Sequence, residues 1–471
     1  MLLSTAVVDV GRRQFCSANA WIELSVNSSS KYPHSHLISL SLIATLTACG
    51  GGGTTTTTVP PATTVTPPAT SSGTTSGTTT SGTTSGTTSG TTTGTTTTGT
   101  TTTGTTTTGT TTTSTAVSGP VIAGCAIFPA NAIFNTRIDD AAKFPAHPQN
   151  TAWKATMQSK LGNPRMHLDW GMNEDSSASD YYGIPYNTVD GSSNTTSWPL
   201  ISYDITDPRD GNGAGVPDES DCAVPNGASF KLQRNCGSVA ATQRRFPFPP
   251  DATIKIEGGT NVANQFATDS HAVVLETGSC RLWESYYTYK FNGQWHSYAS
   301  AAWNLNSLEM RPETWGSGDA AGLPILPLLV RADEASAGEI KHALRVTLPG
   351  SVMASIRATN GYVWPGRHAA GQLATGGIPF GALLRLRSDF VIPSTWNTQA
   401  KAVATAMKRY GLYIADNGSS FYVQGEPSVK WNSNTYSQLQ QAITLDKLEF
   451  VSLNSITQNA KFNKDSMAAS W

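Results

Sequence analysis

Asp269, His271 and Glu284 are the residues whose types and spacing most directly suit acid–base chemistry in this sequence. Cleavage of a glycosidic bond by hydrolysis or β-elimination needs a proton donor and a proton acceptor a few ångströms apart. A carboxyl group and an imidazole fill those roles when partial burial brings their pKa values toward neutrality. We therefore predict that Glu284 and His271 are catalytic and that Asp269 orients His271. The alternative is a buried structural pair.

The spacing of these residues places them on one face of a predicted hairpin. Strand-like residues lie on both sides of Gly278-Ser279, which suits a two-residue turn with glycine first. In that register Glu276 faces Arg281, an opposite-charge pair that supports the register. His271 and Glu284 are then diagonal neighbours on one face. A three-residue loop would shift the register by one residue and separate them.

Aromatic side chains beside polar groups predict a second kind of site, which binds sugars. Aromatic rings stack on sugar faces, while arginine and carboxylate side chains bond the hydroxyl groups. Eleven of the twelve tryptophans lie in 120–471. The predicted substrate-binding residues are His167, Asp169, Trp170, Tyr362, Trp364, Arg367 and His368. The alternative is that the tryptophans fill a large core.

The sequence carries no strong metal or cofactor signature. It has no HExxH, GxSxG, Walker or dinucleotide-binding motif, and no Cys/His cluster at zinc spacing. Glu339 and His342 could join His271 in a metal site, but strand-borne pairs of this kind are usually structural. We therefore predict no metal and no cofactor.

Length and charge exclude several classes of partner. The chain has 471 residues, with 31 Lys and Arg against 32 Asp and Glu, and a net charge of −1. Because there is no basic cluster, nucleic acid is not expected as a ligand. No apolar run reaches the length of a membrane-spanning helix.

The N-terminal part of the chain predicts export and a membrane anchor. An apolar run over 37–48 has the size of a signal-peptide core, and Cys49 follows it directly. The ending LTAC resembles a bacterial lipobox, in which lipid on the cysteine anchors the protein. We predict a signal region over 1–49, a disordered Thr/Gly/Ser-rich linker over 50–119 and a globular domain over 120–471. The implied location is the bacterial cell envelope, at the outer membrane or cell surface.

Four cysteines remain in the predicted domain, Cys125, Cys222, Cys236 and Cys280. In an exported domain an even number favours disulfides, for which three pairings are possible. Cys222 and Cys236 flank a polar Gly/Asn/Pro segment, which favours a local bridge. That leaves Cys125 to pair with Cys280. Free thiols are the alternative.

Short strand-like runs dominate the predicted domain. Helical spacing is clear over 397–410, where apolar residues recur every three or four positions before Gly411. Runs that suit strands are 253–257, 271–276, 280–289, 343–348, 382–387, 412–415, 421–424 and 448–453. This pattern predicts a mainly β fold, a β-sandwich or jelly-roll-like domain with one or two helices.

Several motifs across 125–455 resemble those of a family of exported bacterial proteins with no assigned activity. The matching segments are Cys125-Ala-Ile-Phe-Pro, His167-Leu-Asp-Trp-Gly, Tyr182-Gly-Ile-Pro-Tyr, Ile256-Glu-Gly-Gly, Asp269-Ser-His, Cys280-Arg-Leu-Trp-Glu, Asp319-Ala-Ala-Gly-Leu-Pro-Ile, Arg331-Ala-Asp-Glu, Gly338-Glu-Ile-Lys-His-Ala-Leu-Arg, Tyr362-Val-Trp-Pro-Gly-Arg-His and Ala415-Asp-Asn-Gly-Ser. The resemblance implies a shared fold and supports a bridge between Cys125 and Cys280, which both belong to the pattern. It implies no substrate and no catalytic residue.

Two classes of function follow. The first is an envelope-anchored, polysaccharide-degrading enzyme, a glycoside hydrolase or lyase with a carboxylate/His acid–base group. The second is a non-catalytic carbohydrate-binding or surface-structure lipoprotein. An enzyme would place two or more carboxylate or histidine groups at the floor of an open groove, whereas a binding module would present a flat aromatic platform. The size of the domain favours the enzyme.

Overall fold

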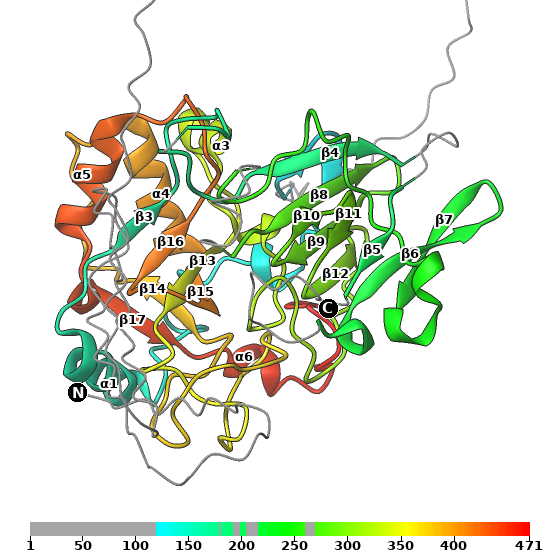
Figure 1. Ribbon diagram of the computed structural model, residues 1–471. Helices are drawn as coiled ribbons and strands as arrows, with labels where there is room; N and C mark the ends of the chain where they lie inside the picture. The colour runs from blue at the N-terminus through cyan, green and yellow to red at the C-terminus, as the bar shows by residue number, and fades with distance from the viewer. Residues whose placement is uncertain (1–118, 179, 192–197, 204–214, 260–268) are drawn as a thin grey trace, which may run out of the picture. The chain divides into compact units, whose positions relative to one another are not determined.

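The computed structural model describes residues 119–471 except 179, 192–197, 204–214 and 260–268 (Figure 1). The predicted signal region, the lipid-attachment residue Cys49 and the Thr/Gly/Ser-rich tract up to Ser118 lie outside the described residues. Within the described part of the chain, no helix is long and apolar enough to cross a membrane.

Strands make up most of the regular structure of the described residues. The strands are β1 (Val121–Ile122), β2 (Cys125–Ala126), β3 (His167–Asp169), β4 (Tyr186–Asp190), β5 (Ile201–Ser202), β6 (Asp221–Asn226), β7 (Ser229–Arg234), β8 (Ala272–Thr277), β9 (Arg281–Tyr286), β10 (Tyr289–Phe291), β11 (Gln294–His296), β12 (Ala299–Asn304), β13 (Leu344–Leu348), β14 (Leu383–Leu386), β15 (Leu412–Asn417), β16 (Tyr422–Gln424) and β17 (Leu448–Val451). The α-helices are α1 (Asn150–Leu161), α3 (Ala332–Ala337), α4 (Thr398–Arg409), α5 (Ser433–Ala442) and α6 (Asn454–Thr457). The fold is therefore mainly β, as predicted.

The predicted hairpin lies in a four-stranded sheet with the strand order β12-β9-β8-β4. Strands β8 and β9 are antiparallel, with Val273 opposite Glu284 and Glu276 opposite Arg281. This is the register that the sequence predicts, and Glu276 forms an ion pair with Arg281 at 3.7 Å. Because side chains alternate between the faces of a strand, Glu284 lies on the face opposite this ion pair.

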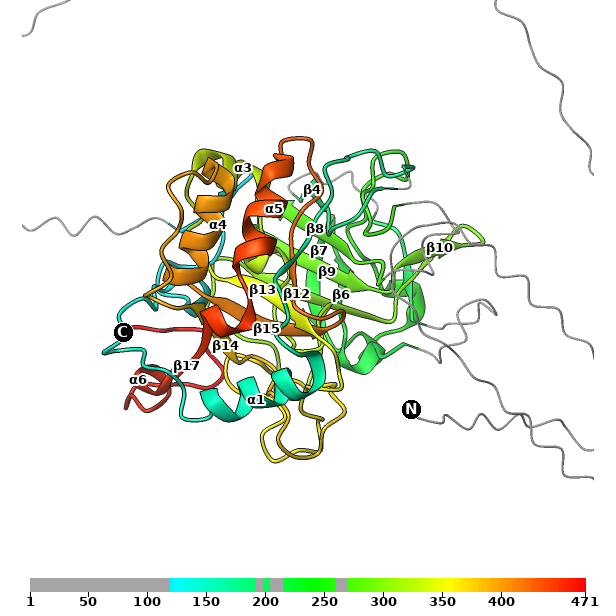
Figure 2. The ribbon, with the colours of Figure 1, turned by 90° about the vertical axis from the view of Figure 1, so that its left-hand side faces the viewer.

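A six-stranded sheet has the strand order β17-β14-β15-β13-β16-β3. Helix α4 confirms the helix predicted over 397–410. It begins after Asn397, whose side chain accepts a hydrogen bond from Ala400 N at 2.8 Å. Its buried stripe, which includes Val403 and Met407, packs beside β14 and α5. Figure 2 shows α1, α4 and α5 over one face of this sheet.

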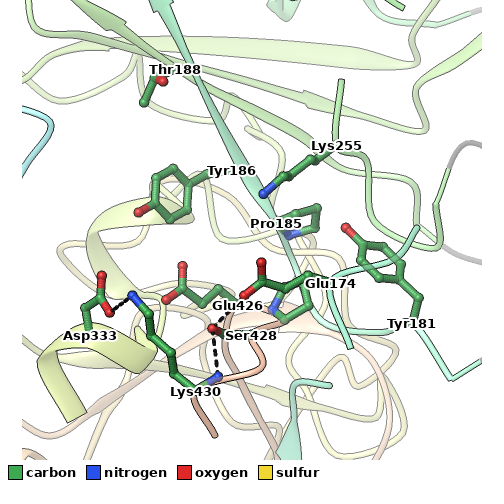
Figure 3. A pocket seen from close by; sticks show the side chains of 11 residues that line it. Glu174, Tyr181, Pro185, Tyr186, Thr188, Lys255, Asp333, Glu426, Ser428 and Lys430 are labelled. Carbon is green, nitrogen blue, oxygen red and sulfur yellow. Dashed lines mark hydrogen bonds and ion pairs between the residues drawn. The ribbon is translucent and has the colours of Figure 1, made fainter. Parts of the chain in front are cut away.

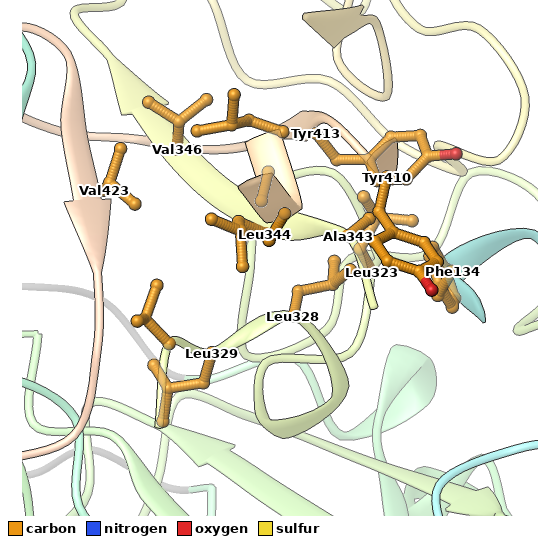
Figure 4. Packing of buried hydrophobic residues seen from close by; sticks show 14 of the residues in the cluster. Phe134, Leu323, Leu328, Leu329, Ala343, Leu344, Val346, Tyr410, Tyr413 and Val423 are labelled. Carbon is orange, nitrogen blue, oxygen red and sulfur yellow. The ribbon is translucent and has the colours of Figure 1, made fainter. Parts of the chain in front are cut away.

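Apolar residues of the two sheets share one buried cluster. Val273 and Leu275 of β8 belong to the same cluster as Leu344 and Val346 of β13. Figure 4 shows the β13 side of this cluster, with Leu344 and Val346. The alternate residues of β8 belong to a second cluster on the other face of the four-stranded sheet. The face that carries Glu284 is therefore turned toward the shared core.

Three sequence-based expectations about the fold need correction. The described residues form five α-helices, not the one or two predicted. The jelly roll is not confirmed, because β4 pairs parallel with β8 and β13 pairs parallel with β15. The run 253–257 forms no strand. The side chain of Asn187 instead bonds the backbone of Lys255, with Nδ2 donating to the carbonyl oxygen and Oδ1 accepting from the amide, both at 2.8 Å.

Both favoured disulfides are present in the structure. Cys125 is bonded to Cys280 across 155 positions of sequence, and Cys222 to Cys236 across 14. The long bridge ties the start of the described chain to the residue before β9, whereas the short one closes the β6–β7 hairpin region.

Removing the long bridge is expected to destabilise the fold more than removing the short one. By the chain-entropy argument, replacing Cys125 and Cys280 with serine lowers the free energy of unfolding by about 5 kcal/mol. The matched change at Cys222 and Cys236 lowers it by about 3 kcal/mol. Urea denaturation of the two double variants measures both values, and a greater loss for the short bridge would contradict the expectation.

Candidate functional site

Charged side chains from both sheets and their loops converge on one site, which we call the acid cluster. Its members are Asp169, Glu257, His271, Glu284, Asp319, Arg345 and Asp416. The four-stranded sheet contributes Glu284 on β9 and His271, directly before β8. The six-stranded sheet contributes Asp169, Arg345 and Asp416, on β3, β13 and β15. The remaining two members lie in loops.

His271 is held by hydrogen bonds at both ring nitrogens. Nδ1 lies 2.6 Å from Glu257 Oε2, and Nε2 lies 2.9 Å from the carbonyl oxygen of Gly318. Burial acts to lower the pKa of His271, but Glu257 outweighs it and the pKa rises to about 10. The imidazolium then donates both bonds. Glu257 therefore makes an orienting contact with His271, and the negative charge of the exposed Asp269 also raises the pKa of His271.

Glu284 is sealed beneath the backbone of residues 325–326. Its side chain is 0 % exposed and accepts hydrogen bonds from Ile325 N at 2.8 and 2.9 Å and from Leu326 N at 3.0 Å. Burial raises the pKa of Glu284 to about 7, although these N–H groups favour the ionised form. In this structure Glu284 has no open path to a substrate, which corrects its assignment as a group that touches one.

Arg345 is a buried cation of the cluster. It is 0 % exposed and forms an ion pair with Asp319. Burial nevertheless raises the pKa of Asp319 to about 7. Asp416 accepts hydrogen bonds from Ala320 N at 3.0 Å and from Asn417 N at 2.8 Å. Burial, and then the proximity of Asp319, raises the pKa of Asp416 to about 8.

Exposure divides the cluster into an inner and an outer layer. The inner residues, each at most 1 % exposed, are His271, Glu284, Asp319 and Arg345. The outer, half-buried residues are Asp169, Glu257 and Asp416. Burial, and then the charge of Glu257, raises the pKa of Asp169 to about 6. Burial acts to raise the pKa of Glu257 as well, but its contact with His271 lowers it overall. The outer layer thus holds two carboxyl groups whose pKa values are shifted in opposite directions.

The raised pKa values predict that stability falls as pH rises from about 5 to about 8. In that window the unfolded chain has ionised Asp319 and Asp416, whereas the folded chain still holds protons on them, so raising the pH favours unfolding. The raised pKa of His271 acts in the same direction above about pH 6.5, because the unfolded chain loses the imidazole proton there while the folded chain keeps it. Melting temperatures measured across this pH range test whether stability falls as the pH rises. Asp416→Asn should flatten the decline, and an unchanged slope in that variant would contradict this origin.

His167 and Asp169 lie on one face of β3, at the edge of the six-stranded sheet. His167 is exposed and its ring stacks on Tyr422 of β16, with ring centroids 4.9 Å apart. Gln424 Nε2 donates a hydrogen bond to Asp169 Oδ2 at 3.3 Å. The structure therefore places an aromatic pair beside an outer carboxyl group of the acid cluster.

Three of the predicted sugar-binding residues have structural contacts instead. Trp170 is 0 % exposed and stacks on Trp431 at 4.7 Å, so it belongs to the core. Arg367 is 3 % exposed, and its guanidinium donates hydrogen bonds to residues 464–465 at 2.7 and 2.9 Å. Trp364 Nε1 donates to the carbonyl oxygen of Ser466 at 3.1 Å. These contacts hold the C-terminal segment against the domain.

The other two residues of that motif differ in their positions. Tyr362 Oη donates to Glu313 at 3.3 Å. His368 Nδ1 lies 2.8 Å from the carbonyl oxygen of Ala320, whose amide bonds Asp416. His368 is therefore linked to the acid cluster through one residue, Ala320.

Three members of the cluster could offer metal ligands. Donor atoms of His271, Asp319 and Asp416 lie within 4.8 Å of one another. Both ring nitrogens of His271 are already engaged, and the Arg345 guanidinium supplies positive charge at Asp319, so we assign no ion there. His342 does not join this group, because its Nε2 lies 3.1 Å from Glu334 Oε2.

Sequence spacing alone does not single out Glu257, Asp319, Arg345 or Asp416. Each lies in a different motif of the family resemblance, up to 159 positions apart in the chain. A usable signal is that each motif places a charged residue within or next to a strand-like apolar run, where an unpaired charge would be costly to bury. Only the folded chain brings together the charged residues that neutralise one another.

Comparison of the chain with protein-family models, with curated proteins and with solved structures gives no significant match. Function is therefore inferred from the geometry of the acid cluster.

Proposed function

We propose that this chain is an envelope-anchored enzyme that cleaves glycosidic bonds in a polysaccharide, as a glycoside hydrolase or lyase. The observation that carries the proposal is the pair of half-buried carboxyl groups with oppositely shifted pKa values. Asp169, with its pKa raised to about 6, suits a general acid. Glu257, whose pKa is lowered, suits an ionised base or nucleophile.

The inner residues act on this pair as positioning groups. His271 keeps Glu257 ionised through the 2.6 Å contact and is itself held by the carbonyl oxygen of Gly318. A Cβ atom added at Gly318 would lie 3.5 Å from the His271 ring and 3.7 Å from Glu284. Ile325 Cδ1 lies 2.8 Å from the same Cβ position, so Glu284, which accepts hydrogen bonds from the amides of residues 325–326, supports the position of Gly318 and through it that of His271. The carboxylate/His group thus keeps a part in the proposed catalysis. The groups that would react with the substrate are the outer carboxyl groups of Asp169 and Glu257, not Glu284 and His271.

Aromatic side chains beside the outer carboxyl groups support a carbohydrate substrate. His167 and Tyr422 stack next to Asp169. On the other sheet, Tyr286 is half-buried and lies beside His271, with ring centroids 5.5 Å apart. Rings of this kind bind the faces of sugars, while carboxyl groups bond their hydroxyls.

Incubating the full chain with a panel of neutral, amino and acidic polysaccharides tests the proposal. Hydrolysis releases reducing ends alone, whereas a lyase also produces an unsaturated sugar that absorbs in the ultraviolet. Cleavage that is lost in Glu257→Gln supports the enzyme. Binding without cleavage across the panel supports the alternative, a non-catalytic carbohydrate-binding lipoprotein.

The proposed anchor is the lipid on Cys49, which lies outside the described residues. We expect the wild-type chain made in a bacterial host to partition into the detergent phase, and Cys49→Ser to partition into the aqueous phase. The physical reason is that acyl chains replace the cleaved signal region as the membrane-binding element. Identical aqueous partitioning of both chains would contradict the anchor.

A further inference from the structure

A polar cavity of about 340 Å³ lies between β4 and the loop after β16, outside the acid cluster (Figure 3). Its lining includes Glu174, Tyr181, Tyr186, Lys255 and Glu426. The volume lies at the lower end of the range for small-molecule sites, about 300–1,000 Å³, and suits one or two sugar rings.

Tyr181 is a buried side chain whose hydroxyl needs a partner. It is 6 % exposed, and its Oη has no hydrogen-bond partner among the described residues. Figure 3 shows this hydroxyl directed into the cavity, toward Pro185 and Lys255. Leaving a buried hydroxyl unpaired costs about 1–3 kcal/mol, which a ligand hydroxyl or amine could recover.

Two carboxylates of the cavity are fixed through one oxygen each. Glu174 Oε1 accepts hydrogen bonds from Ser428 Oγ at 2.9 Å and from Val429 N at 3.1 Å. Glu426 Oε1 accepts from Ala332 N at 2.8 Å. In Figure 3 the second oxygen of Glu174 points away from Ser428 and into the cavity. Such preset acceptors suit ligand hydroxyl or amine groups.

The charges of the lining disfavour an anionic ligand. Lys430 is neutralised by its ion pair with Asp333. Among the lining residues, Glu174 and Glu426 then have one further cation, Lys255, and the nearby Arg331 forms an ion pair with Glu334. A carboxylate brought into the cavity would therefore meet a net negative charge, whereas a neutral or protonated ligand would not.

Tyr181 connects this cavity with the acid cluster. Burial raises the pKa of its phenol, and the charges of Glu257 and of Glu174 raise it further. Lys255, which lines the cavity, lies two positions before Glu257, so the segment 255–257 reaches from the cavity to the acid cluster.

We propose that this cavity is a sugar-binding subsite that takes a neutral or amine-bearing ring of the substrate polymer and excludes uronates. The proposal rests on the proposed function for the identity of the polymer. Tyr181 and Glu426 form hydrogen bonds with the sugar ring. The net negative charge of the lining repels acidic rings.

Calorimetric titration tests the subsite on the full chain carrying Asp169→Asn, which prevents turnover. The probes are cellohexaose, a chitosan hexamer and a mannuronate hexamer. We expect cellohexaose or the chitosan hexamer to bind more tightly than the mannuronate hexamer. Tyr181→Phe should weaken that binding about five- to tenfold, and Glu426→Gln at least about tenfold for the chitosan hexamer. Tyr182→Phe is the matched control, because its ring is exposed and does not line the cavity.

The outcomes separate this inference from the proposed function. Preferred binding of the mannuronate hexamer, no binding of any probe, or affinities unchanged by both variants would overturn the subsite. If Glu257→Gln still abolishes cleavage in those cases, the proposed function stands and the subsite alone fails. If the variants weaken binding as expected but no polysaccharide is cleaved by the wild-type chain, the subsite stands and the enzyme fails.

Discussion

Glu257→Gln and Asp169→Asn are each expected to lower turnover at least about a hundredfold, the usual contribution of general acid–base catalysis. Glutamine at 257 cannot carry the negative charge that His271 stabilises, and asparagine at 169 cannot donate the proton. Both substitutions keep the volume and one carbonyl acceptor of the original side chain. Neutral His271 can still bond Gly318, so we expect Glu257→Gln to fold.

The pH dependence of turnover distinguishes the two roles. In the wild type, kcat/KM should decline as Asp169 loses its proton, above a pKa of about 6 in the free enzyme. This decline at higher pH should be absent in Asp169→Asn, whose activity should be low and independent of pH. The matched control is Glu309→Gln, whose carboxylate is 67 % exposed and lies outside the cluster. Full activity in either cluster variant, with the control behaving identically, would remove the assignment.

The hairpin shows what local patterns predict well in this chain. An opposite-charge pair, Glu276 and Arg281, and a turn that begins with glycine are enough to determine the register of β8 and β9. The register in turn places His271 and Glu284 on one face. The helix near Asn397 follows from similar local evidence, a cap and an apolar stripe. These features depend on residues within about twenty positions of one another.

The role of Glu284 could not be predicted from the same evidence. Its exposure depends on the backbone of residues 325–326, which are about forty positions away and approach the sheet through a loop. A strand pattern states which face a carboxyl group occupies but not what covers that face. The contact between Glu257 and His271 could not be predicted for a related reason, since the loop that carries Glu257 is positioned by tertiary contacts.

Local sequence patterns also do not predict how the strands are arranged in the sheets. Runs of alternating residues predict strands over 343–348, 382–387 and 412–415, and strands lie there. They do not show that β13 pairs parallel with β15, or that β3 joins β16 at the edge. Those long-range pairings bring Asp169, Arg345 and Asp416 to one site, because side chains on neighbouring strands of one face lie close together.

Arg345→Met is expected to lower the free energy of unfolding by about 3–5 kcal/mol near neutral pH, the usual cost of leaving a buried charge without its partner. The guanidinium is 0 % exposed and forms an ion pair with Asp319. It also lowers the pKa values of Asp319 and Asp416, which burial raises. Without it, these carboxyl groups must remain protonated or pay the full cost of an unpaired buried charge.

The loss should therefore depend on pH in a definite direction. At about pH 5 both aspartates are already protonated in the folded chain, so removing the cation costs less than at about pH 8. Denaturant titrations of the wild type and the variant at both values measure the difference. Arg387→Met is the matched control, because its ion pair with Asp389 is exposed and should contribute less than about 1 kcal/mol at either pH. The loss of unfolding free energy in Arg345→Met could instead be equal at the two pH values, or no larger than that of the control. Either result would mean that protonation of the carboxyl groups alone makes the cluster neutral. In that case the guanidinium would not set the charge state on which the proposed acid–base pair depends.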